Sequence, residues 1–152
     1  MKKIIYTRPD GGVSIVCPAI NINDPVGFDE EQALARAMAR LPAEAINPQV
    51  VDDSIIPVDR TFRNALIQNG ASVIHDMPKC RDIHRDKLRE LRRPLFAEND
   101  IAIRDAQVDG DSAKLAAAIA RRNALRDVTA DPRIDAAQTP EALKAVMPEV
   151  LK

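Results

Sequence analysis

The stretch Asp109-Gly110-Asp111-Ser112 decides the fold of the C-terminal half, because it separates two long segments with helical periodicity. From Lys79 to Val108, apolar residues recur at spacings of about three and four among charged residues, which predicts a largely helical span with one charged face. After the glycine, Asp111 or Ser112 can cap a second helix that runs through Val128. The sequence therefore predicts an antiparallel helical hairpin.

Pro94 falls inside the first of these helices. A proline in a helix interior removes a backbone hydrogen bond and kinks the helix, whereas a proline at a helix start is well tolerated. Both alternatives, a kinked helix and a second helix that begins at Pro94, are open. The second arm of the hairpin carries an apolar stripe, formed by Leu115, Ala118, Ile119 and Leu125.

The last residues of the chain carry further helix and turn signals. Thr139-Pro140-Glu141 combines a capping residue, a first-turn proline and an acid, which predicts a short helix through Val146. Asp131-Pro132 predicts a turn before it.

Two hairpin signals mark the N-terminal half. Lys3–Thr7 and Val13–Cys17 are β-branched and apolar and flank a proline and two glycines, so they should pair. Asn69-Gly70, a dipeptide that tolerates positive φ, predicts a second hairpin between Thr61–Gln68 and Ala71–His75. A helical conformation of residues 62–67 is an open alternative, because the strand alternation there is not one-sided.

The segment between these hairpins mixes loop, helix and strand signals. Asn21–Gly27 is rich in turn-forming residues and is expected to be a loop, and Asp29 should cap a helix that ends near Leu41, before Pro42. One short strand is expected within Ala43–Pro57.

The predicted fold class is α+β. Small antiparallel β-hairpins belong to a mixed region, residues 1–77, and the helical hairpin with a short C-terminal helix belongs to residues 78–152. Whether the two halves form one body or two is open, and Asp76-Met77-Pro78 is the expected hinge.

Composition excludes several function classes. The 152 residues carry 22 lysines and arginines against 23 acids, a net charge of −1, which gives no long-range field for nucleic acid or an anionic membrane. No run of about 18 apolar residues is present, so no membrane span is expected. The two cysteines, Cys17 and Cys80, follow no metal or redox spacing and are expected to be reduced thiols in a soluble intracellular protein.

The candidates for chemistry are few. His75, Cys80 and His84 lie within ten residues, and with Asp76 or Asp82 they could hold a metal in a small metal-dependent enzyme. No paired-histidine or paired-cysteine motif accompanies them, so the expected arrangement has no metal, no cofactor and no catalytic residue. A basic run interleaved with acids at helical spacing predicts ion-paired surfaces rather than a phosphate or DNA site, and its members are Arg81, Arg85, Arg89, Arg92 and Arg93.

A resemblance can be named at the C-terminus. Arg122 to Asp127 spells R-x-A-L-R-D, Ile134 follows, and Met147-Pro148 closes the chain where the pattern has Trp-Pro. These features resemble the end of small tail proteins of tailed bacteriophages and prophages, including tail fibre assembly proteins. The resemblance covers only the C-terminal third of the chain.

The resemblance implies a non-enzymatic protein that binds other tail or tail fibre proteins, in the bacterial host cytoplasm during assembly or in the virion. A striped hairpin is suited to packing against a partner helix or another copy, which makes a homo-oligomer the expectation. The predicted interface anchors are Leu115, Ile119 and Leu125. The alternative is that these three residues serve only the core of the protein itself. A small metal-dependent enzyme and a DNA-binding regulator are the competing function classes.

Overall fold

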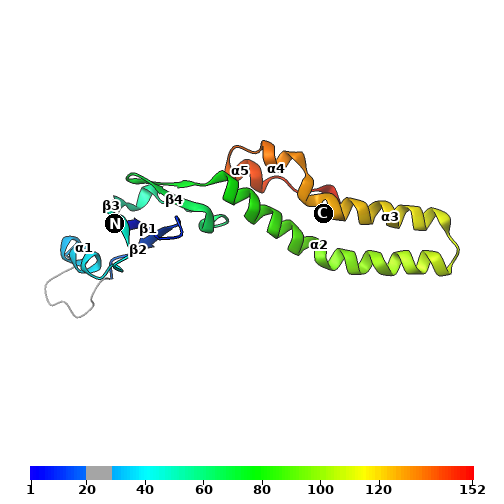
Figure 1. Cartoon of the computed structure of the whole chain (residues 1–152), viewed down its shortest axis with the longest axis horizontal. Coiled ribbons are helices and arrows are strands. Elements are labelled where there is room, and N and C mark those ends of the chain that lie inside the picture. Colours follow the sequence, from blue (N-terminus) through cyan, green and yellow to red (C-terminus); the bar gives the residue numbers. More distant parts are fainter. Residues whose placement is uncertain (20–28) are drawn as a thin grey trace. The chain divides into compact units, whose positions relative to one another are not determined.

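The computed structural model describes residues 1–19 and 29–152. Residue contacts divide the chain into two compact units, Met1–Asp76 and Met77–Lys152. The predicted boundary, between residues 77 and 78, lies one residue away. Figure 1 shows the strands confined to the first unit and the long helices to the second, which confirms the α+β class.

The first unit contains a three-stranded antiparallel sheet in the order β2-β1-β3. The predicted N-terminal hairpin is confirmed: β1 (Lys2–Thr7) pairs with β2 (Val13–Val16). The strand expected between residues 43 and 57 is β3 (Ile46–Asp52), which pairs with the other side of β1. Pro48 is tolerated inside β3 because β3 lies at the edge of the sheet, where one side of the strand needs no backbone donors.

The second hairpin is shorter than predicted, and it turns at Gly70-Ala71 rather than at Asn69-Gly70, because Asn69 pairs with Ser72. β4 (Leu66–Asn69) pairs with β5 (Ser72–His75) around Gly70, which has a φ of +59°. The expected strand from residue 61 to 65 is wrong, because residues 63–65 form the 3-10 turn η2 (Arg63–Ala65). One apolar core cluster joins both sheets, and it consists of Ile5, Val13, Val51, Ile56, Leu66 and Val73.

The helix α1 (Glu30–Ala39) begins as predicted and ends two residues before the predicted Leu41. The carboxylate of Asp29 accepts hydrogen bonds from the backbone N–H groups of Glu31 and Gln32, at 3.0 and 3.3 Å. The loop expected at 21–27 lies outside the described residues. A 3-10 turn, η1 (Asp53–Ile55), follows β3.

The second unit is built on the predicted hairpin of α2 (Met77–Val108) and α3 (Ser112–Asp127). Asp111 caps α3 by accepting a hydrogen bond from the backbone N–H of Lys114 at 3.0 Å, and Gly110 turns the chain with a φ of +67°. Pro94 lies inside α2, so the helix continues through it. Figure 1 shows α2 changing direction near its middle, as expected where a proline removes a helical hydrogen bond.

Short helices complete this unit and pack against the first half of α2 and the end of α3. They are η3 (Val128–Ala130), α4 (Pro132–Ala136), α5 (Pro140–Lys144) and η4 (Glu149–Leu151). The turn predicted at Asp131-Pro132 is wrong, because Pro132 is the first residue of α4 and Asp131 caps that helix. Thr139 caps α5 as predicted, and α5 ends at Lys144 rather than at Val146.

The core of the second unit lies at the base of the hairpin, where the short helices meet α2. Its fully buried apolar side chains are Cys80, Leu88, Leu125, Ile134 and Leu143. Across residues 1–19 and 29–152, no helix combines the length and the apolar character that crossing a membrane requires.

Candidate functional site

The three predicted interface anchors lie on α3 but differ in exposure. Ile119 is 46% exposed, Leu115 is half-buried, and Leu125 is fully buried. Leu115 and Ile119 are four residues apart and so share one face of the helix. Leu125 has no exposed surface that a partner could contact in this conformation. For Leu125, the alternative that the residue serves only the core of the protein therefore holds. Ile119 is the exposed anchor of the three.

Other large apolar side chains of the hairpin are also exposed, and all of them belong to α2. Ile101 and Val108, seven residues apart on one side of the helix, are 55% and 81% exposed, and Leu91 is 41% exposed. Periodicity identified Leu91 and Ile101 as apolar positions of a helix. Periodicity alone does not reveal which apolar positions the second arm covers.

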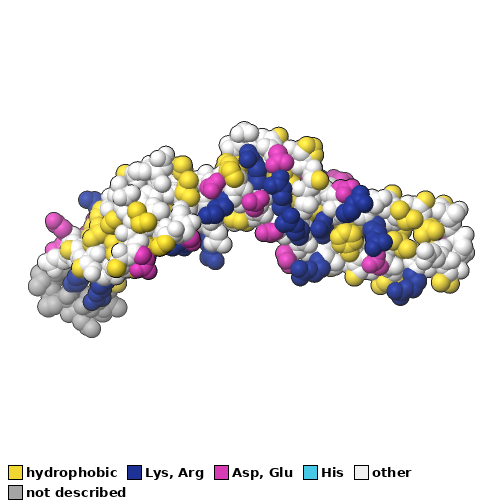
Figure 2. Space-filling view, in the orientation of Figure 1, with side chains coloured by type: hydrophobic (Ala, Val, Ile, Leu, Met, Phe, Trp, Pro, Cys, Tyr) yellow, Lys and Arg dark blue, Asp and Glu magenta, His cyan; other side chains and the backbone are white. Residues whose placement is uncertain are grey.

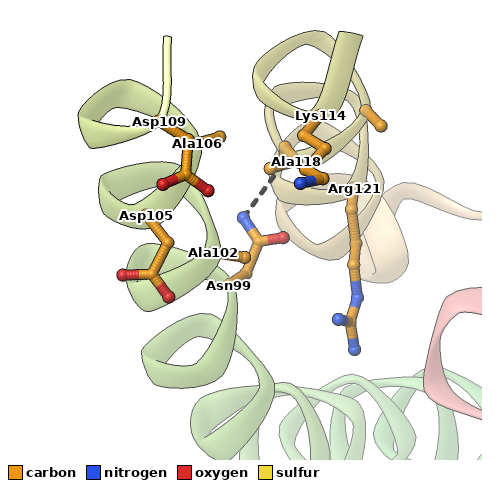
Figure 3. Close-up of a pocket in the computed structure, with 9 residues that line it drawn as sticks. Asn99, Ala102, Asp105, Ala106, Asp109, Lys114, Ala118 and Arg121 are labelled. Atoms are coloured by element: carbon orange, nitrogen blue, oxygen red, sulfur yellow. Dashed lines mark hydrogen bonds between the residues drawn. The ribbon is translucent and has the colours of Figure 1, made fainter. Parts of the chain in front are cut away.

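A groove runs between the two arms towards the turn of the hairpin, with a volume of about 530 Å³. Alanines from both helices lie along it, and Figure 3 shows Asp105 and Asp109 on α2 and Lys114 and Arg121 on α3. Its lining residues are Asn99, Ala102, Asp105, Ala106, Asp109, Lys114, Ala117, Ala118 and Arg121. The groove therefore has a small-residue floor, an acidic edge and a basic edge, and on the basic edge Lys114 lies 3.3 Å from Asp111 and Arg121 lies 4.0 Å from Glu98.

Asn99 lies in this groove and is fully buried. Its Nδ2 donates a hydrogen bond to the backbone carbonyl oxygen of Ala118 at 3.0 Å, which ties the two arms together (Figure 3). Its Oδ1 is buried and has no hydrogen-bond partner in the structure. Leaving such an acceptor unsatisfied costs roughly 1–3 kcal/mol. An asparagine among charged residues gives no sequence signal of burial, so it was missed.

Arginine side chains hold the base of the hairpin together. Nη1 of Arg92 donates to the backbone carbonyl oxygens of Leu125 and Arg126, at 3.3 and 2.6 Å. The same guanidinium lies 5.6 Å from the ring centre of Phe96. These bonds satisfy carbonyls at the C-terminal end of α3, where positive charge is also favourable.

Three members of the remaining basic run are ion-paired, as predicted, whereas Arg81 donates to the backbone carbonyl oxygen of Ala137 at 3.0 Å. Arg85 lies 2.6 Å from Asp135 of α4, and Arg89 and Arg93 pair with Asp86 and Glu90 one turn earlier. Figure 2 shows basic side chains gathered over the second unit with acidic side chains among them. These ion pairs compensate the charges of Arg85, Arg89 and Arg93.

The three residues considered for a metal site are divided between the two units. His75 belongs to β5, whereas Cys80 and His84 are buried in α2. Nε2 of His84 lies 2.9 Å from the carbonyl oxygen of Val146, which can only accept, so Nε2 carries the proton. Among the described residues, no three histidine, cysteine or acidic side chains gather in a way that could hold a metal ion.

Burial lowers the pKa of His84 below its ordinary value of 6.5, and the nearby charge of Lys87 lowers it further, whereas the hydrogen bond to Val146 opposes the shift. The histidine is therefore neutral at neutral pH. Its role in this structure is to connect α2 with the end of the chain.

Three residues of the C-terminal motif line one hollow of about 410 Å³. Ala124 and Asp127 of α3 line it together with Pro148, and Arg126 pairs with Asp127 at 2.8 Å. The two separated parts of the motif thus lie together at the base of the hairpin. Comparison with known proteins finds no family model, no curated protein and no solved structure that matches this chain.

Proposed function

We propose that this protein is not an enzyme and acts by binding other polypeptides through the α2–α3 hairpin. The observation that carries the proposal is the exposure of Ile119, at 46%, beside half-buried Leu115 on one face of a rigid helix. The same unit buries Leu88 and Leu125 completely, so it has a core of its own and still leaves large apolar side chains outside.

Exposed apolar side chains on a helix favour association. Full burial of a side chain such as isoleucine is worth about 1.5–3 kcal/mol, and a few such anchors dominate most interfaces. A helical backbone fixes the anchor before the partner arrives, which lowers the entropic cost of binding. Ile119 is therefore expected to be the main anchor, with Leu115 beside it.

We assign the partners to the tail of a bacteriophage. The support is the resemblance of Arg122–Asp127 and Met147-Pro148 to the end of small tail proteins. The protein is then a tail or tail fibre assembly factor, or a structural component of the particle. It acts in the cytoplasm of the bacterial host during phage assembly or remains in the virion, and it binds neither nucleic acid nor membrane.

Complementation tests this function. The gene is deleted from the phage or prophage that encodes it, and tails are examined by electron microscopy after complementation with wild type, Ile119→Asp or Ala120→Asp. Ala120 is the matched control because it is an exposed residue of the same helix. We expect that wild type and Ala120→Asp restore complete tails and that Ile119→Asp does not. Complete, infectious particles without the protein would overturn the proposed function.

A further inference from the structure

We propose that a second copy of this chain occupies the groove near the turn of the α2–α3 hairpin, so that two hairpins form a four-helix bundle with their turns at the same end. This inference deepens the proposed function and rests on it in one respect, that the hairpin acts by binding another chain. It names the occupant of one surface of that hairpin.

The floor of the groove suits the close approach of another helix. Ala102 and Ala106 of α2 and Ala117 and Ala118 of α3 are small, and the distance between packed helices falls as the side chains at the contact become smaller. The apolar surface continues along α2 towards the base of the hairpin. Leu91, 41% exposed, and half-buried Leu95 lie eleven and seven residues before Ala102, on the same side of the helix.

The charged edges of the groove select a second copy and its orientation. If a two-fold axis runs along the hairpin, α2 of each copy faces α3 of the other at the same height. The acidic edge, Asp105 and Asp109, then meets the basic edge of the second copy, Lys114 and Arg121, on both sides of the bundle. If the axis runs across the hairpin, α2 faces α2 and acid meets acid. The groove is therefore complementary to itself only with the turns together.

Asn99 holds together the two arms that form the groove. It is fully buried in the groove lining, and its Oδ1 has no hydrogen-bond partner. The amide nitrogen has two N–H groups, of which one is donated to the carbonyl oxygen of Ala118. Because Asn99 is fully buried within one chain, it does not contact the second copy; its bond to Ala118 holds the two arms together where they form the groove.

The test is sedimentation equilibrium of the full chain over a range of concentrations up to about 1 mM, the dissociation constant of a weak complex. One variant makes both edges basic, Asp105→Lys with Asp109→Lys. The other makes both edges acidic, Lys114→Glu with Arg121→Glu. All four residues are exposed, and circular dichroism verifies that each variant keeps its helices. The wild type is expected to dimerise, each variant alone should dimerise at least tenfold more weakly, and an equimolar mixture of the two should restore the dimer.

Three results would overturn the inference: a wild type that stays monomeric throughout, a dimer that survives both charge reversals, or a mixture that remains monomeric. Ile119→Asp separates this inference from the proposed function. Ile119 follows Ala118 directly, so its side chain lies about 100° further round α3, outside the groove lining. Its substitution should leave the dimer intact while it abolishes tail assembly. If the protein is monomeric and tail assembly still depends on Ile119, the proposed dimer is wrong and the proposed function is supported.

Discussion

Nε2 of His84 and the carbonyl oxygen of Val146, 62 positions apart in the sequence, lie 2.9 Å apart and join the first turns of α2 to the segment after α5. His84 is buried, and its pKa lies below 6.5, mainly because burial disfavours the charged imidazolium. The last residues of the chain are thus held to the hairpin by a neutral histidine.

Acidification is therefore expected to weaken the second unit. In the unfolded chain His84 binds a proton near pH 6.5, whereas in the folded chain it does so only at lower pH. Below about pH 6.5 the unfolded state binds more protons, so the free energy of unfolding falls as the pH falls, by at most about 1.4 kcal/mol per pH unit. The free energy of unfolding stops falling once the pH is below the lowered pKa of His84 in the folded state.

Urea unfolding at about pH 7.5 and about pH 5.5 measures this effect, with His84→Gln as the comparison. Glutamine can still donate to the Val146 carbonyl but does not titrate. The variant should lack the decrease that the wild type shows in this window. Asp111, Asp127 and Asp131 have pKa values lowered below 3.8 by their hydrogen bonds, so their contributions are lost only at more acidic pH. An equal decrease in both proteins would rule out His84 as the cause.

Arg92 should stabilise the hairpin far more than its neighbour Arg93. Arg92→Ala removes two hydrogen bonds to carbonyls at the end of α3, and its expected cost is about 1–3 kcal/mol. Arg93 pairs only with exposed Glu90 among the contacts seen, so Arg93→Ala should change the free energy of unfolding by less than about 0.5 kcal/mol. Chemical denaturation compares the two variants, and similar effects from both would contradict the assigned contacts.

Much of the fold follows from local signals that carry their own geometry. Gly70 and Gly110 specify turns because their backbones adopt positive φ, and Asp111 and Thr139 cap helices because their side chains accept hydrogen bonds from free N–H groups. Each of these predictions depends only on residues that lie within a few positions of one another in the sequence.

The features that sequence reasoning missed depend on partners far along the chain. Asn99 is buried because α3 returns beside it, and its hydrogen-bond partner Ala118 lies 19 residues away. The burial of His84 could not be predicted, because nothing near it in the sequence shows that the last residues fold back onto α2. The same limit applies to Leu125 and Ile119, which belong to one stripe in the sequence but are 0% and 46% exposed.

Truncation of Leu125 and of Ile119 should have different effects on stability, because Leu125 is a core residue and Ile119 is a surface residue. Leu125→Ala leaves a cavity in a closed core and is expected to cost about 2–5 kcal/mol of unfolding free energy. Ile119→Ala removes a side chain that is 46% exposed and should cost less than about 1.5 kcal/mol. Thermal or urea unfolding of the two variants checks the order. A larger loss for Ile119 would place that residue in the core and remove it as an interface anchor.

A binding measurement with tail proteins tests most directly whether the hairpin acts by binding other polypeptides. The tagged full chain is titrated with each tail and tail fibre protein encoded beside its gene, and Ile119→Asp and Ala120→Asp are titrated in parallel. We predict that at least one protein binds wild type and Ala120→Asp with equal affinity. Its affinity for Ile119→Asp should be at least tenfold lower, a loss of about 1.4 kcal/mol or more. Binding that is the same for wild type and Ile119→Asp, or no binding by any of these proteins, would contradict this role.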